Sequence, residues 1–134
     1  MNISLRRGER IFINGAVIRV DRKVCLELMN DVTFLLENHV MQQQDASTPL
    51  KRLYFAIQAT LIAPNDCEAA LDLCRDLLGS LRTASRHPGI SSGLSLTTGY
   101  VNEGRMFEAL KSVRALFPLE QALPGESLAS REHA

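Results

Sequence analysis

Six basic side chains crowd into the first 24 residues of this chain: Arg6, Arg7, Arg10, Arg19, Arg22 and Lys23. Only two acidic residues share that stretch, whereas the rest of the chain holds nine basic and 13 acidic residues. Cationic side chains bind phosphates and release condensed counterions, so this cluster could hold a nucleic-acid backbone. A second interpretation stays open, because charged residues also keep exposed strand edges from pairing with other chains.

The sequence contains no pattern typical of catalysis or metal binding. We find no paired carboxylates, no nucleophile elbow and no glycine-rich phosphate loop, and the three histidines (His39, His87 and His133) are scattered. We therefore expect no enzymatic activity, no cofactor and no metal. His39 follows the predicted strands, where it could contact RNA or form a hydrogen bond at a strand–helix junction.

The three cysteines (Cys25, Cys67 and Cys74) show no metal-type pairing. Cys67 and Cys74 would lie about 10.5 Å apart along one helix, which is too far for a disulfide. We interpret them as reduced residues of the helix core in an intracellular protein. With no signal-peptide layout and no stretch long enough to span a bilayer, the sequence predicts a cytoplasmic protein without membrane contact.

The alternation of apolar and polar residues over 1–37 predicts five short strands in a meander. Turns are expected at Arg7-Gly8-Glu9, at the strong hairpin signal Asn14-Gly15, at Asp21-Arg22 and at Asn30-Asp31. So small a sheet cannot cover both its faces, and its apolar side needs a helix, a second sheet or a second subunit.

The period then changes to that of helices. Thr48-Pro49 predicts an N-cap and a helix over 49–62, and a stripe of Cys67, Leu71, Cys74, Leu78 and Leu81 predicts a second helix that ends at His87-Pro88-Gly89. Residues 89–103 have poor helix propensity and predict at most a marginal helix. A last helix carries Met106, Leu110, Val113 and Phe117 and is expected to stop at Pro118.

These elements predict an α+β fold: a basic antiparallel β module (1–40), a helical module of three or four helices (46–119) and a flexible tail (120–134). We expect the helix over 49–62 to pack against the β module. A homodimer or higher homo-oligomer through the β module would double the basic surface.

Four segments resemble the FlbT family: GERIFINGAVIR (8–19), LELMNDVTFLLENHVM (26–41), ASTPLKRLYFAIQ (46–58) and EGRMFEALKSVRALFP (103–118). The resemblance implies a cytoplasmic post-transcriptional regulator that associates with the 5′ untranslated region of flagellin mRNA. FlbT-like proteins lower translation or lifetime of this mRNA, and some act as activators instead. The resemblance also implies a companion, the FlaF-like regulator. Residues 89–100 depart from the family pattern.

ISLRRGERIFING (3–15) is also similar to the opening of the carbon storage regulator (CsrA) family. That resemblance implies intertwined subunits that bind mRNA leaders through edge-strand arginines, so Arg6 and Arg7 would face RNA. The chain departs from that pattern after its last strand, where Leu35-Leu36-Glu37 lacks the second arginine of the CsrA-like site.

Two functions therefore stand side by side. The first is RNA binding, with phosphate contacts from Arg6, Arg7, Arg10, Arg19, Arg22 and Lys23 and specificity from single-stranded bases. The second is a protein–protein adaptor or chaperone-like partner in flagellar assembly, acting with FlaF without direct RNA contact. In that case the apolar stripes around Leu71–Leu81 and Met106–Phe117 would dock a partner helix.

Overall fold

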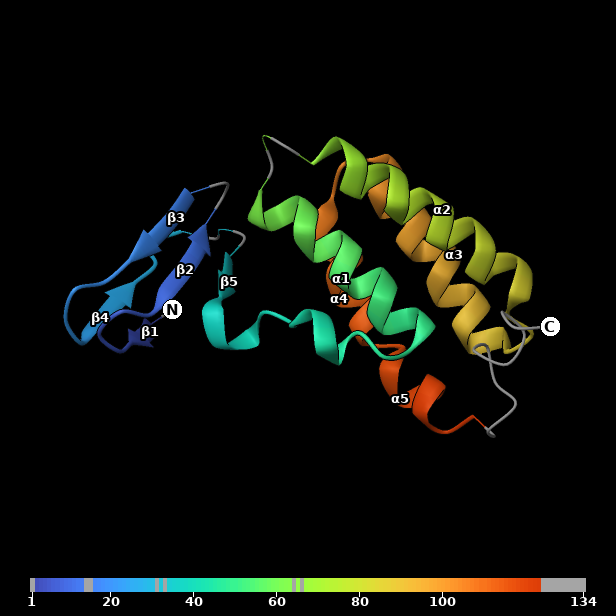
Figure 1. The fold of residues 1–134 in the computed structure, drawn as a ribbon, viewed down its shortest axis with the longest axis horizontal. Helices are drawn as coiled ribbons and strands as arrows, with labels where there is room; N and C mark the ends of the chain where they lie inside the picture. Colours follow the sequence, from blue (N-terminus) through green and yellow to red (C-terminus); the bar gives the residue numbers. More distant parts are fainter. Residues whose placement is uncertain are drawn as a thin grey trace.

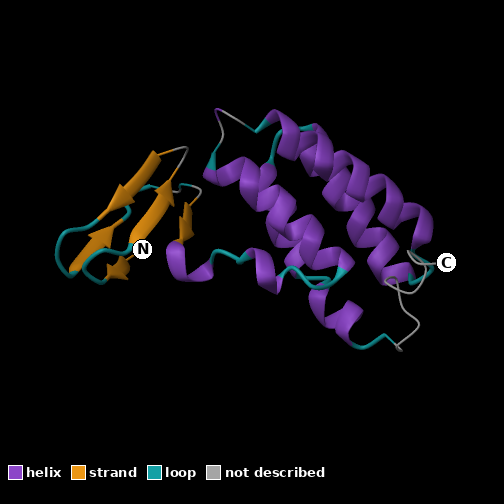
Figure 2. Ribbon diagram, viewed as in Figure 1, coloured by secondary structure: helices purple, strands orange, loops and turns teal. Residues whose placement is uncertain are grey.

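The structure is a computed structural model that describes residues 2–13, 16–30, 32, 34–63, 65 and 67–123. The strands lie together at one end of an elongated molecule and the helices occupy the other end (Figure 2). Within these residues five strands precede five α-helices (Figure 1). The predicted α+β fold is confirmed.

The β region contains two small antiparallel sheets. Its strands are β1 (Asn2–Leu5), β2 (Arg10–Ile13), β3 (Ala16–Arg19), β4 (Val24–Glu27) and β5 (Phe34–Leu36). One sheet pairs β1 with β4, and the other has the order β3–β2–β5. The predicted meander is therefore wrong in its strand order. The predicted turns at Asn14-Gly15 and Asn30-Asp31 lie wholly or partly outside the described residues.

Apolar pairing explains this order. Ile3 lies opposite Leu26 and Leu5 opposite Val24, so β1 and β4 each present their apolar face beside the other's. This face packs with Ile11 of β2 in a small core of its own. A second sheet thus covers one face of β2. From the sequence, a helix, a second sheet or a second subunit could have filled this role.

The other face of β2 turns toward the helices. Phe12 lies opposite Leu35 of β5, and both belong to the main core together with residues of the first long helix. The far edge strand β3 is exposed along its whole length, with Val17 53% and Ile18 41% exposed. The helical region therefore covers β2 and β5 and leaves β3 open.

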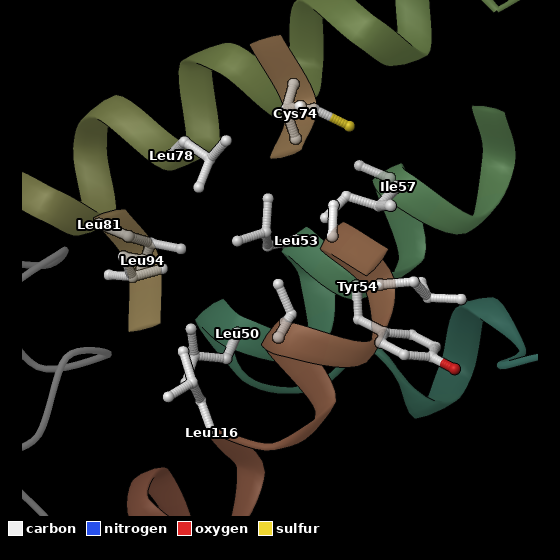
Figure 3. Packing of buried hydrophobic residues seen from close by; sticks show 14 of the residues in the cluster. Leu50, Leu53, Tyr54, Ile57, Cys74, Leu78, Leu81, Leu94 and Leu116 are labelled. Carbon is white, nitrogen blue, oxygen red and sulfur yellow. The ribbon is translucent and has the colours of Figure 1, made fainter. Parts of the chain in front are cut away.

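Two short 3-10 helices lead from the strands to the helical region. They are η1 (Glu37–His39) and η2 (Gln43–Asp45), and they are followed by α1 (Pro49–Ile62), α2 (Glu68–Ala84), α3 (Pro88–Asn102), α4 (Met106–Arg114) and α5 (Phe117–Gln121). Helix α1 packs against both α2 and α4. Figure 3 shows Leu50, Leu53 and Ile57 of α1 among Cys74, Leu78 and Leu81 of α2.

The start of α1 follows the predicted pattern. Thr48 is the N-cap, its hydroxyl oxygen accepts a hydrogen bond from Lys51 N at 3.2 Å, and Pro49 occupies the first turn. Glu120 of α5 adds a partner from the far end of the described chain. Its carboxylate accepts from the Thr48 hydroxyl and, at 3.0 Å, from Leu50 N. The two ends of the helical region are thus joined at one cap.

The boundary between α2 and α3 differs from the prediction. His87-Pro88-Gly89 was expected to end the second helix, but α2 ends at Ala84 and these residues begin α3. His87 is the N-cap, and its Nδ1 accepts a hydrogen bond from Ile90 N at 3.2 Å. Pro88 has no backbone N–H to lose at the first helical position, so it favours a helix start here.

Close packing explains why a full helix forms over the segment that the sequence predicted to be marginal. A Cβ on Gly93 would lie 2.5 Å from a methyl carbon of Leu116, so only glycine lets this leucine approach α3. Farther along, the hydroxyls of Thr97 and Ser112 lie 2.6 Å apart across the α3–α4 contact. The residues of α3 with weak helix propensity are small, so neighbouring segments can pack closely against this helix.

The last predicted helix is divided in two. Helix α4 ends at Arg114, and Phe117 and Pro118 open α5 rather than completing the apolar face of α4. Proline breaks a helix interior but is tolerated in a first turn, which explains the division. Phe117 instead packs its ring against Tyr54, with ring centres 5.4 Å apart. The tail beyond Leu123 lies outside the described residues.

Candidate nucleic-acid interface

The first two arginines occupy a tight turn between β1 and β2. Glu9 N donates to Arg6 O at 3.0 Å, and the Glu9 carboxylate accepts from Arg6 N at 2.6 Å. Gly8 has a φ of +84°, a left-handed conformation that glycine adopts without a steric penalty. Both arginine side chains are exposed. Hydrogen bonds therefore fix the backbone of this turn, and the turn carries two exposed cationic side chains.

A second basic turn lies beside the first. Gly8 N donates to Val20 O at 2.8 Å, and Val20 N donates to Glu9 O at 3.2 Å. These bonds join the β1–β2 turn to the end of β3, directly before Arg22 and Lys23. The pairing of Leu5 with Val24 brings the same two turns together from the other side. Cations that are 15 or more residues apart in the chain thus meet at one end of the β region.

Arg10 and Arg19 extend this group onto the β3–β2–β5 sheet, where they lie directly opposite each other. Like charges in a cross-strand pair repel each other. Glu37 of η1 offsets this repulsion, because its carboxylate accepts from Arg10 N at 2.7 Å and from Arg10 Nη2 at 3.2 Å. Arg10 therefore has a structural partner, and Arg19 has none among the described residues.

The same contacts lower the pKa of Glu37 below its ordinary value. The backbone N–H of Arg10 has the largest effect, and the Arg10 guanidinium adds to it through a hydrogen bond and its charge, while partial desolvation opposes both. Glu37 is thus held as a carboxylate beside the basic group. In the sequence, Glu37 was notable because it stands where the CsrA-like site would have its second arginine.

The structure places all six predicted residues at one end of the β region, but not all are equally available. We call this group the basic end, and it consists of Arg6, Arg7, Arg10, Arg19, Arg22 and Lys23. Arg22 pairs with Asp21 at 3.4 Å, and both side chains are largely exposed, so water weakens that pair. In the part of the chain that the structure describes, the side chains of Arg6, Arg7, Arg19 and Lys23 form no ion pair.

A pocket of about 290 Å³ lies between the strands and the helices. Its walls come from β5, η1, α1 and α4, and its basic members are His39, Lys111 and Arg114. Sequence reasoning missed the last two residues. The available signal was two cations three residues apart beside Phe107, in an otherwise acidic half of the chain. From the sequence we considered only the apolar stripe on this helix and not its two cations.

The remaining candidates have structural positions. Cys74 is fully buried, and burial raises the pKa of its thiol to about 11. Cys67 is only partly buried and occupies the N-cap position of α2 without a capping side-chain hydrogen bond, so the predicted core position holds for Cys74 alone. His133 lies outside the described residues. Among the described residues, no three histidine, cysteine or acidic side chains are grouped so as to hold a metal ion.

The two stripes proposed as docking surfaces are largely used inside the chain. Cys74, Leu78 and Leu81 of α2, and Leu110 and Val113 of α4, are buried in the common core.

No helix in the described ranges is both long and apolar enough to cross a membrane.

Comparison with known proteins decides the family. A family model described as "Flagellar protein FlbT" matches residues 1–123. A protein of Brucella anthropi is 51% identical over 125 residues, covering 93% of this chain and 82% of its own length. A protein of Chelativorans sp. (strain BNC1) is 48% identical over 121 residues, covering 90% of this chain and 83% of its own.

The chain belongs to the FlbT family. The predicted resemblance is therefore confirmed. The region that the family model matches includes the basic end, the pocket and the α3 segment that departs from the expected pattern. Both relatives bear the name "Probable flagellum biosynthesis repressor protein FlbT". No solved structure matches the chain.

Proposed function

We propose that this FlbT-family protein is a post-transcriptional repressor of flagellar biosynthesis that binds the 5′ untranslated region of flagellin mRNA. The observation that carries this proposal is the basic end, where six cations from two turns and two paired strands meet. The names of the two relatives describe probable repressors of flagellum biosynthesis, which supports the regulatory half of the proposal.

The chemistry of the basic end suits a nucleic-acid backbone. Arginine guanidinium groups form two parallel hydrogen bonds to a phosphate, and separate turns can engage successive phosphates of one strand. Such contacts give affinity and position but no sequence selectivity, so the choice of bases needs a second surface. Repression would then follow from competition with ribosomes or from faster decay of the occupied leader.

A filter-binding titration of the purified full chain against flagellin leader RNA tests the proposal. We expect Arg6→Ala/Arg7→Ala to weaken binding by at least tenfold. Each lost phosphate contact should also reduce the slope of log affinity against log salt concentration by about 0.7. Arg82→Ala/Arg86→Ala removes the same charge near the end of α2 that lies away from the strands, and it serves as the matched control (Figure 1). Equal binding by the wild type and the Arg6/Arg7 variant would refute this site.

A further inference from the structure

The pocket lies along an open strand edge. Phe34, Leu35 and Leu36 are consecutive residues of β5, and all three line it. Successive side chains of a strand point to opposite faces, so three in a row can line one pocket only where it borders the edge of the strand. Among the described strands, β5 pairs only with β2. The other side of β5 is therefore a sheet edge, where backbone donors and acceptors could meet an occupant.

The walls combine aromatic and aliphatic side chains, and the charged side chains that line the pocket are basic. Phe34, Tyr54 and Phe107 come from three separate elements, and the lining includes no aspartate or glutamate. Figure 3 shows Tyr54 at the margin of the core with its hydroxyl directed away from the leucines. Lys111 and Arg114 lie one turn apart on α4, and Lys111 Nζ is 5.5 Å from the centre of the Phe107 ring. Such a lining fits an occupant that is flat, aromatic and attached to an anion.

The pocket also adjoins the basic end. Glu37 and His39 belong to the same short helix η1; Glu37 is bonded to Arg10, while His39 lines the pocket. A single RNA strand could therefore contact Arg10 and Arg19 and also reach the pocket along the same side of the protein. With a volume of about 290 Å³ the pocket is at the small end of ligand sites, a size that suits one ring system rather than a large ligand.

We propose that this pocket binds one unstacked base of the single-stranded RNA, with the neighbouring phosphates held by Lys111 and Arg114. The inference rests on the proposed function and adds the surface that could read a base. The base would stack on Phe107, and the open backbone edge of β5 would offer hydrogen bonds to its polar edge.

Phe107→Trp provides a direct reporter, since the chain contains no tryptophan. We expect a 12-nucleotide single-stranded RNA to quench its fluorescence by base stacking. The same oligomer with abasic sites, and inorganic polyphosphate, should bind without comparable quenching. A polyglutamate peptide represents the competing class of occupant, an acidic protein segment, and we expect it to cause no quenching.

A pair of charge variants tests the phosphate contacts. Lys111→Gln/Arg114→Gln should weaken RNA binding by about tenfold and lower the salt slope by about 1.4, whereas the matched Arg82→Gln/Arg86→Gln should change affinity less than twofold. Phe107→Leu should lose affinity and Phe107→Tyr should keep it, which separates stacking from packing. Circular dichroism melting curves establish that each variant is folded.

The outcomes separate this inference from the proposed function. If RNA binds through Arg6 and Arg7 but neither quenches Phe107→Trp nor responds to Lys111→Gln/Arg114→Gln, the pocket assignment is wrong and the proposed function stands. If no leader RNA binds at all, both fail. Quenching by polyglutamate that matches quenching by RNA would overturn the base-binding assignment in favour of a protein-docking pocket.

Discussion

Arg10 and Glu37 form the joint between the basic end and the segment that leads to the helices. The Glu37 carboxylate accepts hydrogen bonds from the backbone N–H of Arg10 at 2.7 Å and from its guanidinium at 3.2 and 3.3 Å. One acidic side chain thus holds the start of β2 against η1 and neutralises one of two directly opposed arginines. Arg10 and Arg19 are equal in charge, but only Arg19 is left without such a partner in the described chain.

This asymmetry separates stability from binding. We expect Arg10→Ala to lower the midpoint of thermal unfolding more than Arg7→Ala does, because only Arg10 makes a contact with a distant element. We expect Arg7→Ala to weaken RNA binding more, because its guanidinium has no internal partner to lose. Melting curves and RNA titrations of the two variants measure both effects. A larger binding loss in Arg10→Ala would mean that the Glu37 contact opens when RNA binds.

The lowered pKa of Glu37 has a consequence for stability at acid pH. A carboxylate whose pKa is lower in the folded state stabilises that state above its unfolded pKa, and this contribution is lost as pH falls through the folded pKa. We therefore expect Glu37→Gln to be less stable than the wild type at pH 7 and the difference to shrink below about pH 4.5. Urea unfolding at pH 7, 5 and 3.5 measures this. A difference independent of pH would show that Glu37 acts through shape rather than charge.

Gly93 allows α3 and the segment after α4 to approach closely. A Cβ at this position would lie 2.5 Å from Leu116, which is itself buried. We expect Gly93→Ala to destabilise the fold by about 1–3 kcal/mol through overpacking. Gly99 lies on the same helix, and a Cβ added there would meet no neighbouring side chain within 4 Å, so Gly99→Ala should stabilise by about 0.5–1 kcal/mol. Urea unfolding of both variants compares them, and the same sign of change in both would contradict the packing argument.

Glu120 completes the cap of α1 from α5. The Thr48 hydroxyl donates to its carboxylate, which also accepts from Leu50 N at 3.0 Å. Thr48→Ala should cost about 1 kcal/mol, the usual loss for a helix N-cap. A double-mutant cycle with Glu120→Ala should give a coupling free energy of about 0.5–3 kcal/mol, since the two side chains are in direct contact. Additive losses would show that Glu120 supports α1 without acting through Thr48.

Local patterns in the sequence were sufficient to predict the type of most elements, α3 excepted. Alternation around Ile3, Leu5, Leu26 and Leu35 identified strands, and Thr48-Pro49 identified the start of α1, because side-chain period and capping act within a few residues. The FlbT membership also followed from contiguous segments. The six cations of the basic end were found for the same reason, as a local excess of charge.

Strand order, helix boundaries and the pocket depended on contacts between distant residues. The pairing of Ile3 with Leu26, the partnership of Arg10 with Glu37 and the approach of Leu116 to Gly93 each join segments more than 20 residues apart. Propensity argued against α3, and packing against small residues overrode it. Lys111 and Arg114 line the same pocket as His39 because α4 lies beside β5 in the folded chain. The sequence by itself thus determined most of the elements, the family and the excess of positive charge, because these are local properties. Only the tertiary structure decided which cations are paired and which line a pocket, because burial and ion pairing are set by chain segments that are remote in sequence.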